Sequence, residues 1–178
     1  FLDICVRQLP GGLCSTHLHG LQPGDTVQAF IRSNPGFALH GSRRAAVLIG
    51  AGTGVAPLAG FIRRNDRRVP IPLYYGGRDP ALDFYFESDI QRWLGEQRLA
   101  RLRTAFSRVP EGGGYVQDAL RRDAPRLREL LASGAVVRVC GSRPMASGVS
   151  KALDEILSTL QSSVLQLKAK GRYAEDLF

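Results

Sequence analysis

Cysteine is scarce in this sequence: its 178 residues contain only Cys5, Cys14 and Cys140. Three scattered cysteines are too few for a disulfide framework or a zinc site, so we predict no metal site and a reducing compartment. No apolar run approaches the roughly 20 residues of a membrane-spanning helix, and the first residues lack a signal-peptide pattern. We therefore expect a cytoplasmic protein or the cytoplasmic side of a membrane-anchored larger chain. Because the sequence does not begin with methionine, we expect it to be part of a longer gene product.

Acidic residues are also few, with 16 Asp and Glu against 24 Lys and Arg, which gives a net charge of +8. Arginine supplies nearly all of the positive charge, but the arginines are spread along predicted helices and are not grouped with aromatic residues. This distribution argues against nucleic acid as a partner. A cleft for phosphates or a surface for an acidic protein partner explains the charge, and a solvated basic face is the alternative.

Residues 1–42 are predicted to be β-rich. Apolar residues alternate with polar ones over 2–6 and again over 26–31, as in half-buried strands. A short helix is predicted over 15–21 and a turn over 23–25. Two strands cannot form a stable sheet alone, so we interpret this region as the truncated end of another domain.

Residues 43–178 show repeated strand–helix alternation, which predicts an α/β fold with a parallel, doubly wound sheet. Helix-breaking Pro125 divides one arginine-rich helical region in two. Strands are predicted at 45–49, 71–75, 99–106 and 135–140, and helices at 58–64, 87–97, 116–133 and 144–160.

A glycine-rich turn follows the first of these strands. Residues 45–49 are all apolar, which is typical of a strand buried on both faces. Gly50, Gly52 and Gly54 allow a tight turn and leave room for a phosphate to approach backbone N–H groups. Pro57 suits the first turn of a helix. The pattern favours a nucleotide-binding loop, and an ordinary tight turn is the alternative.

Small, hydroxyl-bearing or basic residues follow all four predicted strands. Ligands of parallel α/β sheets bind beyond the carboxyl ends of the strands, so these residues are expected to form one ligand crevice. The segments concerned are Gly52-Thr53-Gly54, Gly76-Gly77-Arg78, Ser107-Arg108 and Gly141-Ser142.

Several motifs occur in an order that resembles the ferredoxin–NADP reductase family, across essentially the whole chain. Within that family they are most similar to the diflavin reductase branch, especially the flavoprotein subunit of bacterial sulfite reductase. The motifs are GTGVAP at 52–57, YGGR at 75–78, AFSR at 105–108, YVQ at 115–117, VCG at 139–141 and GRYAEDLF at 171–178.

The resemblance implies FAD and NADP(H) as cofactors. It implies that 1–42 is the end of an antiparallel FAD-binding β-barrel, that 43–178 is the NADP-binding domain, and that the family's Arg-x-Tyr-Ser flavin motif precedes residue 1. Hydride would pass from NADPH to FAD, and electrons would then pass to a flavodoxin-like or FMN domain or to another acidic acceptor. An NADP(H)-binding regulatory module without redox turnover is the alternative. The implied FAD pyrophosphate loop is Gly12, Leu13, Cys14 and Ser15.

The resemblance also implies an NADP site. Ser107 and Arg108 would hold the 2′-phosphate, Tyr115 would stack on adenine and Gln117 would donate a hydrogen bond nearby. Relatives often have a lysine where this chain has Gly113, which implies one phosphate contact fewer. A solvated Ser-Arg pair and a half-buried strand aromatic are the alternatives. The other implied cofactor-binding residues are Gly52, Thr53, Gly54, Arg78 and Gly141.

Three residues are implied at the hydride-transfer position. Cys140 would pack beside nicotinamide, and we do not predict a nucleophile because no histidine accompanies it. Asp176 would stabilise charge and proton movement. Phe178 would stack on the flavin ring and move to admit nicotinamide. A buried strand-end cysteine, a solvated acid and a frayed terminus are the alternatives. Met145 matches a family methionine, whereas Gly148 replaces an acidic residue.

Overall fold

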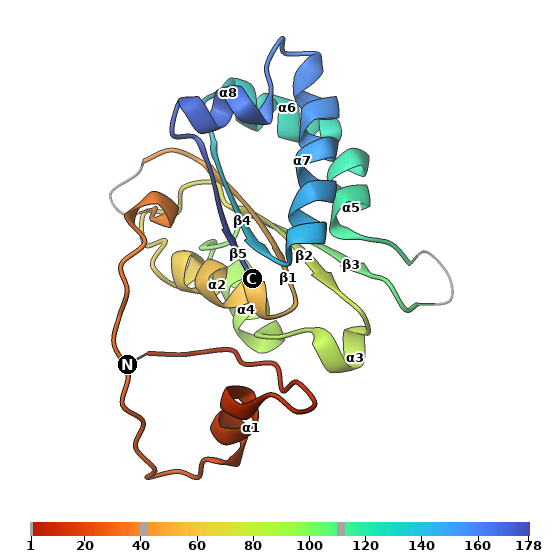
Figure 1. Ribbon diagram of the computed structural model, residues 1–178. Coiled ribbons are helices and arrows are strands. Elements are labelled where there is room, and N and C mark those ends of the chain that lie inside the picture. The colour runs from red at the N-terminus through yellow and green to blue at the C-terminus, as the bar shows by residue number, and fades with distance from the viewer. Residues whose placement is uncertain (1, 40–42, 110–112) are drawn as a thin grey trace.

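The computed structural model describes residues 2–39, 43–109 and 113–178. Five strands form one sheet in the order β3-β2-β1-β4-β5, and every pairing is parallel (Figure 1). This confirms the predicted α/β fold with a parallel sheet. The strands are β1 Ala46–Ala51, β2 Pro72–Gly77, β3 Arg101–Phe106, β4 Val136–Gly141 and β5 Tyr173–Leu177.

Strand β1 lies at the centre of the sheet, and its apolar run is buried on both faces as predicted. Val47, Leu48 and Ile49 are completely buried. Leu48 pairs with Leu73 of β2 on one side and with Arg138 of β4 on the other. The chain therefore extends the sheet through β2 and β3, then returns to the opposite side of β1 with β4. Such a reversal of strand order opens a crevice for ligands at the carboxyl ends of the strands.

Helices cover both faces of the sheet, so the fold is doubly wound (Figure 1). Pro125 lies in the first turn of α6, so the proline separates α5 from α6 as predicted. In the described ranges no helix combines the length and apolarity needed to cross a membrane. One face is covered by α2 Val55–Arg63 and α4 Glu87–Gly95, and the other by α5 Val116–Arg122, α6 Ala124–Ala132, α7 Arg143–Ser158 and α8 Val164–Ala169.

Two α-helices and one strand were not predicted. Helix α3, Pro80–Asp83, is a single turn, and α8 has six residues, so neither shows a long helical pattern. Strand β5 carries the acidic pair Glu175 and Asp176, which is unfavourable for a strand by propensity. Its pairing with β4, in which Cys140 faces Asp176, overrides that preference.

The N-terminal region corrects the sequence analysis in part. Neither 2–6 nor 26–31 is a strand, and within the described ranges no strand pairs with them. Their apolar side chains are exposed, with Ile4 at 65% and Phe30 at 89%. An alternating pattern yields a strand only when a partner supplies hydrogen bonds, so the barrel stays a prediction. The expected helix does form as α1, Leu13–Gly20.

The end of this region is fixed to the sheet by a buried arginine. Arg138, 6% exposed, lies on β4 and donates to the carbonyl oxygens of Phe37 (3.2 Å) and Ala38 (3.0 Å). Phe37 ends the short 3₁₀ helix η1, Pro35–Phe37, and its ring lies 5.6 Å from that of Phe61 on α2. Burial lowers the pKa of Arg138.

Candidate dinucleotide site

A cavity of about 550 Å³ lies at the carboxyl ends of the strands. It is lined by residues from the loops after β1, β2 and β3, from the start of α5 and α7, and from the residue after β5. The structure thus brings together strand ends that are far apart in sequence, as predicted. The predicted site residues that line it are Gly52, Thr53, Arg78, Ser107, Tyr115, Gln117 and Phe178.

The glycine-rich loop approaches β4 so closely that no side chain fits between them. A Cβ atom at Gly54 would lie 2.2 Å from the carbonyl oxygen of Cys140 and 2.9 Å from the amide nitrogen of Gly141. The loop forms the 3₁₀ helix η2, Gly52–Gly54, and leads directly into α2. The unpaired N–H groups of a helix start therefore lie beside the cavity, an arrangement suited to a phosphate.

The end of β4 is shaped by a second close approach. Gly141 has φ +150°, a conformation that side-chain-bearing residues rarely adopt, and a Cβ there would lie 2.5 Å from Cε of Met145. Met145 lines the cavity. Ser142 precedes α7, and its hydroxyl accepts a hydrogen bond from the Met145 N–H at 3.4 Å.

The loop after β2 is held by a buried tyrosine and a carboxylate. Tyr75 is completely buried; its hydroxyl donates to the Asp83 carbonyl and accepts from the Tyr85 N–H at 3.3 Å. Burial raises the pKa of Tyr75 to about 12. The Asp83 carboxylate accepts from the backbone N–H groups of Arg78 (3.2 Å) and Asp79 (3.0 Å). Arg78 is thereby held at the rim of the cavity.

The predicted phosphate-binding pair follows β3 and is joined to the loop after β2. The Ser107 N–H donates to the Gly77 carbonyl at 3.1 Å, and the Arg108 N–H donates to the Arg78 carbonyl at 2.8 Å. Ser107 lines the cavity, whereas Arg108 is exposed beside it. The backbone of both residues is therefore held at the edge of the crevice.

Tyr115 is positioned for contact with a ligand. Its N–H donates to the Asp118 carboxylate at 2.9 Å and caps α5, while its side chain is 62% exposed and lines the cavity. An exposed ring fixed at its backbone suits stacking on a planar base. A Cβ at Gly113 would lie 2.8 Å from the Val109 carbonyl oxygen, so the loop in this conformation has no room for a lysine.

Gln117 takes the space that Gly148 leaves free. A Cβ at Gly148 on α7 would lie 3.1 Å from Nε2 of Gln117 on α5. A larger residue at position 148 would therefore require the Gln117 amide, which lines the cavity, to shift.

The residues expected at the hydride-transfer position lie together at the ends of β4 and β5. Cys140 is 4% exposed and pairs in register with Asp176. Burial, with a smaller effect of the Asp176 charge, raises the pKa of Cys140 to about 12, so its thiol is neutral and suited to packing. The Phe178 N–H donates to the Gly141 carbonyl at 3.2 Å, and the side chain is 67% exposed.

The four residues expected to bind FAD do not line this cavity. They lie at the start of α1, where the Ser15 hydroxyl accepts from the Leu9 N–H (3.1 Å) and donates to the Gly12 carbonyl (3.3 Å). Leu13 is 88% exposed and Cys14 is exposed. Both hydrogen bonds of the Ser15 hydroxyl are thus made within its own loop, and FAD binding here stays a prediction.

The residues that line the cavity and were not predicted include Arg7, Asp83 and Tyr85. Asp83 and Tyr85 lie in and just after the short helix α3, whose pattern is too brief to detect. Arg7 comes from the N-terminal region and lines the same cavity as Tyr85. No sequence pattern connects Arg7 with residues 100 positions away, so only the fold could reveal it.

Fold and site together define a dinucleotide-binding α/β domain, with a crevice at the reversal of strand order. Residues 48–151 match the oxidoreductase NAD-binding domain family, and the chain belongs to it. Its relatives include a self-sufficient cytochrome P450 monooxygenase of Phanerodontia chrysosporium, at 36% identity over 94% of this chain. Nitric oxide synthase 3 of Sus scrofa and inducible nitric oxide synthase of Homo sapiens are 34% and 32% identical over the same share.

These relatives support a place in the diflavin reductase branch of the ferredoxin–NADP reductase family. They agree with the resemblance found in the sequence at the level of the branch. The alignments cover 18% of the monooxygenase and 16% of each synthase, so this chain corresponds to a small part of each.

Proposed function

We propose that this chain is the NADPH-binding part of an FAD-containing reductase that passes electrons to a flavodoxin-like or FMN domain, or to another acidic acceptor. Its family membership makes it an NAD(P)-binding oxidoreductase domain; the choice of NADPH, the flavin and the acceptor are the proposal. The observation that carries it is the meeting of Thr53, Ser107, Tyr115 and Phe178 around one cavity. We also propose, from the motif resemblance, a sulfite reductase flavoprotein-like enzyme working in the cytoplasm.

The described residues fit a dinucleotide phosphate by shape and by charge. The contact between Gly54 and Cys140 brings the backbone of the glycine-rich loop to the crevice without an intervening side chain. Arg7 and Arg78 line the cavity, and its carboxylate, Asp83, already accepts two backbone hydrogen bonds. Ser107 and Arg108 would hold the 2′-phosphate, Tyr115 the adenine and Gln117 the neighbouring ribose. In this arrangement the domain works by positioning its ligand.

At the other end of the crevice, Cys140 would set the depth at which nicotinamide lies, and its neutral thiol avoids placing a charge there. Asp176, next to it in register, would stabilise positive charge at the ring. Phe178, tied by its N–H to Gly141, would cover the position until the ring enters. NADPH, when bound, supplies the hydride and FAD accepts it.

The test is the double variant Ser107→Ala with Arg108→Ala. A charged hydrogen bond contributes about 1.5–3 kcal/mol, so losing two such contacts is expected to weaken NADPH binding by about 100-fold or more. NADH lacks the 2′-phosphate and should bind the variant and the wild type almost equally. Isothermal titration of both coenzymes measures the difference, and an equal loss for both would refute the assignment.

Redox turnover is tested in the complete gene product. NADPH should bleach the absorption of its bound flavin, and the double variant should need a much higher NADPH concentration for the same rate. Tight NADPH binding without any bleaching would favour a regulatory module instead.

A further inference from the structure

A second cavity, of about 450 Å³, lies at the opposite edge of the sheet from the dinucleotide site. Ala46 at the start of β1 and Ile71 just before β2 line it, so it lies at the amino ends of the strands. We call it the rear cavity. Its apolar side includes Phe61, Val69 and Ile71, and its basic side consists of Arg44, Arg64 and Arg67.

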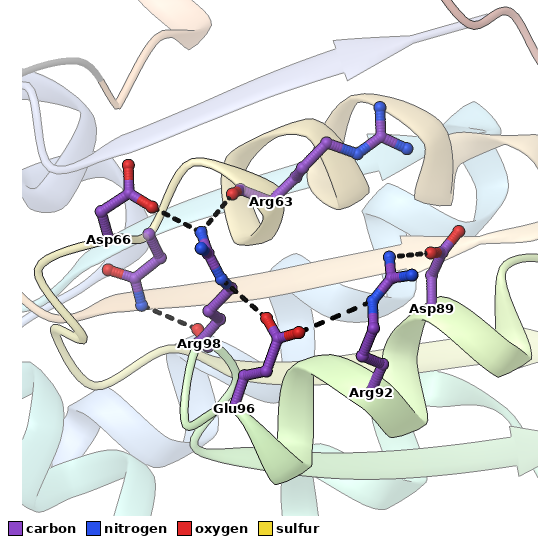
Figure 2. A network of polar contacts seen from close by, with 7 residues as sticks. Arg63, Asp66, Asp89, Arg92, Glu96 and Arg98 are labelled. Carbon is purple, nitrogen blue, oxygen red and sulfur yellow. Dashed lines mark hydrogen bonds and ion pairs between the residues drawn. The ribbon is translucent and has the colours of Figure 1, made fainter.

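The carboxylate that lines the rear cavity, Asp66, already forms an ion pair with Arg98. Asp66 accepts a hydrogen bond from Nη1 of Arg98 at 2.6 Å, and the same nitrogen donates to the Arg63 carbonyl at 2.7 Å. Figure 2 shows Arg98 between Asp66 and Glu96, which binds Arg98 Nε at 2.9 Å. The network continues through Arg92 to Asp89 on α4. Asp66 is therefore not available to neutralise the arginines of the cavity.

Two of the arginines in the rear cavity have no such partner. Within the described ranges, the side chains of Arg64 and Arg67 form neither an ion pair nor a hydrogen bond. Arg44 lines the same cavity. An anion would therefore meet two guanidinium groups, those of Arg64 and Arg67, that no carboxylate pairs with in the described part of the chain.

The loop that carries Arg64 and Arg67 is rigidly built. Asn65, 6% exposed, donates from Nδ2 to the carbonyls of Val69 (2.9 Å) and Arg98 (2.7 Å), and its Oδ1 accepts from the Val69 N–H at 3.1 Å. The buried amide fixes the loop between α2 and β2 with all of its polar atoms paired. The two exposed arginines thus extend from a fixed backbone, so no ordering of the loop itself is needed when a ligand binds.

We propose that the rear cavity is a binding site for a small organic anion that carries at least two negative charges on an apolar or aromatic body. The apolar body packs on Phe61 and Ile71, and the phosphate or carboxylate groups pair with Arg64 and Arg67. Guanidinium groups suit both kinds of oxyanion. The site is separate from the dinucleotide crevice and binds its ligand while NADP⁺ is present.

The experiment is isothermal titration of the chain, saturated with NADP⁺, with two probes. 1-Naphthyl phosphate represents a phosphorylated ligand and naphthalene-2,6-dicarboxylate a dicarboxylate, so their relative affinities identify the preferred head group. The double variant Arg64→Gln with Arg67→Gln should bind the preferred probe at least about tenfold more weakly. The control, Arg126→Gln with Arg128→Gln on α6, removes the same charge from the other face and should stay within about twofold of wild type.

Both double variants should keep the wild-type affinity for NADP⁺, which shows that they are folded. Equal weakening in the two variants would mean that only the net charge attracts the probes, and the proposal would fail. It would also fail if neither probe bound at millimolar concentration, or if neutral 1-naphthol bound as well as the anions.

Discussion

Replacing Gly54 with alanine tests the contact on which the dinucleotide crevice depends. The new Cβ would lie 2.2 Å from the oxygen and 2.6 Å from the carbon of the Cys140 carbonyl. Both atoms belong to the backbone of β4, which is paired on both sides, so neither can rotate away as a flexible side chain would. Either the end of β4 or the glycine-rich loop must move.

Two opposing effects set the change in the free energy of unfolding caused by Gly54→Ala. Gly54 has φ −62°, which alanine adopts freely, so the substitution by itself stabilises the fold by about 0.4–1 kcal/mol because it lowers the conformational entropy of the unfolded chain. Overpacking in a tight site costs about 1–3 kcal/mol and more where backbone must shift. The steric cost is larger, so we expect a net loss of about 1–2 kcal/mol and a fall in Tm of about 3–6 °C for a chain of this size. Displacement of the loop should also weaken NADP⁺ binding by about tenfold.

Gly60→Ala is the matched control. It lies on the same helix, α2, and a Cβ there would meet nothing within 4 Å. The same substitution should therefore raise stability by about 0.5–1 kcal/mol and leave NADP⁺ affinity unchanged. Thermal unfolding followed by circular dichroism, with and without NADP⁺, measures both effects. A Gly54→Ala protein as stable as wild type would refute the steric argument.

Two other predictions concern the ends of the crevice. The pKa of Cys140 is raised from 9.0 to about 12, so its neutral form stabilises the fold below pH 9 and this contribution is lost as pH rises toward 12. At pH 8.5, iodoacetamide should modify exposed Cys14 at least about 100-fold faster than Cys140, as measured by peptide mass spectrometry; similar rates would contradict the burial argument. Arg7→Gln should weaken NADP⁺ binding by about tenfold and Arg32→Gln, an exposed residue of the same region, should not; equal affinities for both variants in a titration would remove Arg7 from the site.

Elements with strong local patterns were predictable, and elements that depend on distant partners were not. The apolar run 46–49 identifies a buried parallel strand because covering both faces requires it. The alternation over 2–6 and 26–31 fits a strand equally well, yet neither segment forms a strand, and none of the residues that the structure describes supplies a partner strand for them. Conversely, β5 has two acidic residues and is a strand because the free edge of β4 pairs with it.

For the site, too, local sequence patterns were predictive and contacts between distant segments were not. The rule that ligands bind at strand ends pointed to Thr53 and Ser107, and both line one cavity because a parallel sheet brings all of its carboxyl ends to one edge. Phe178, which only the family resemblance suggested, lines the same cavity; the roles of all three residues stay predictions. Arg7 could not be found in this way, since it reaches the crevice from a region without regular structure. The spacing of residues along the sequence also could not reveal that the side chain of Gln117 lies against Gly148, because that contact depends on how α5 packs against α7.

The buried arginine of β4 has a consequence for how the protein can be divided. Its guanidinium is neutralised by no carboxylate in the described part of the chain and donates to the carbonyls of Phe37, Ala38 and Val137. Cutting the chain at residue 43 would remove two of these acceptors and expose to water the apolar surface that Phe37 covers, so we expect the shortened chain to be less stable. Residues 35–38 therefore pack as part of the sheet domain, although they precede the predicted boundary at residue 43.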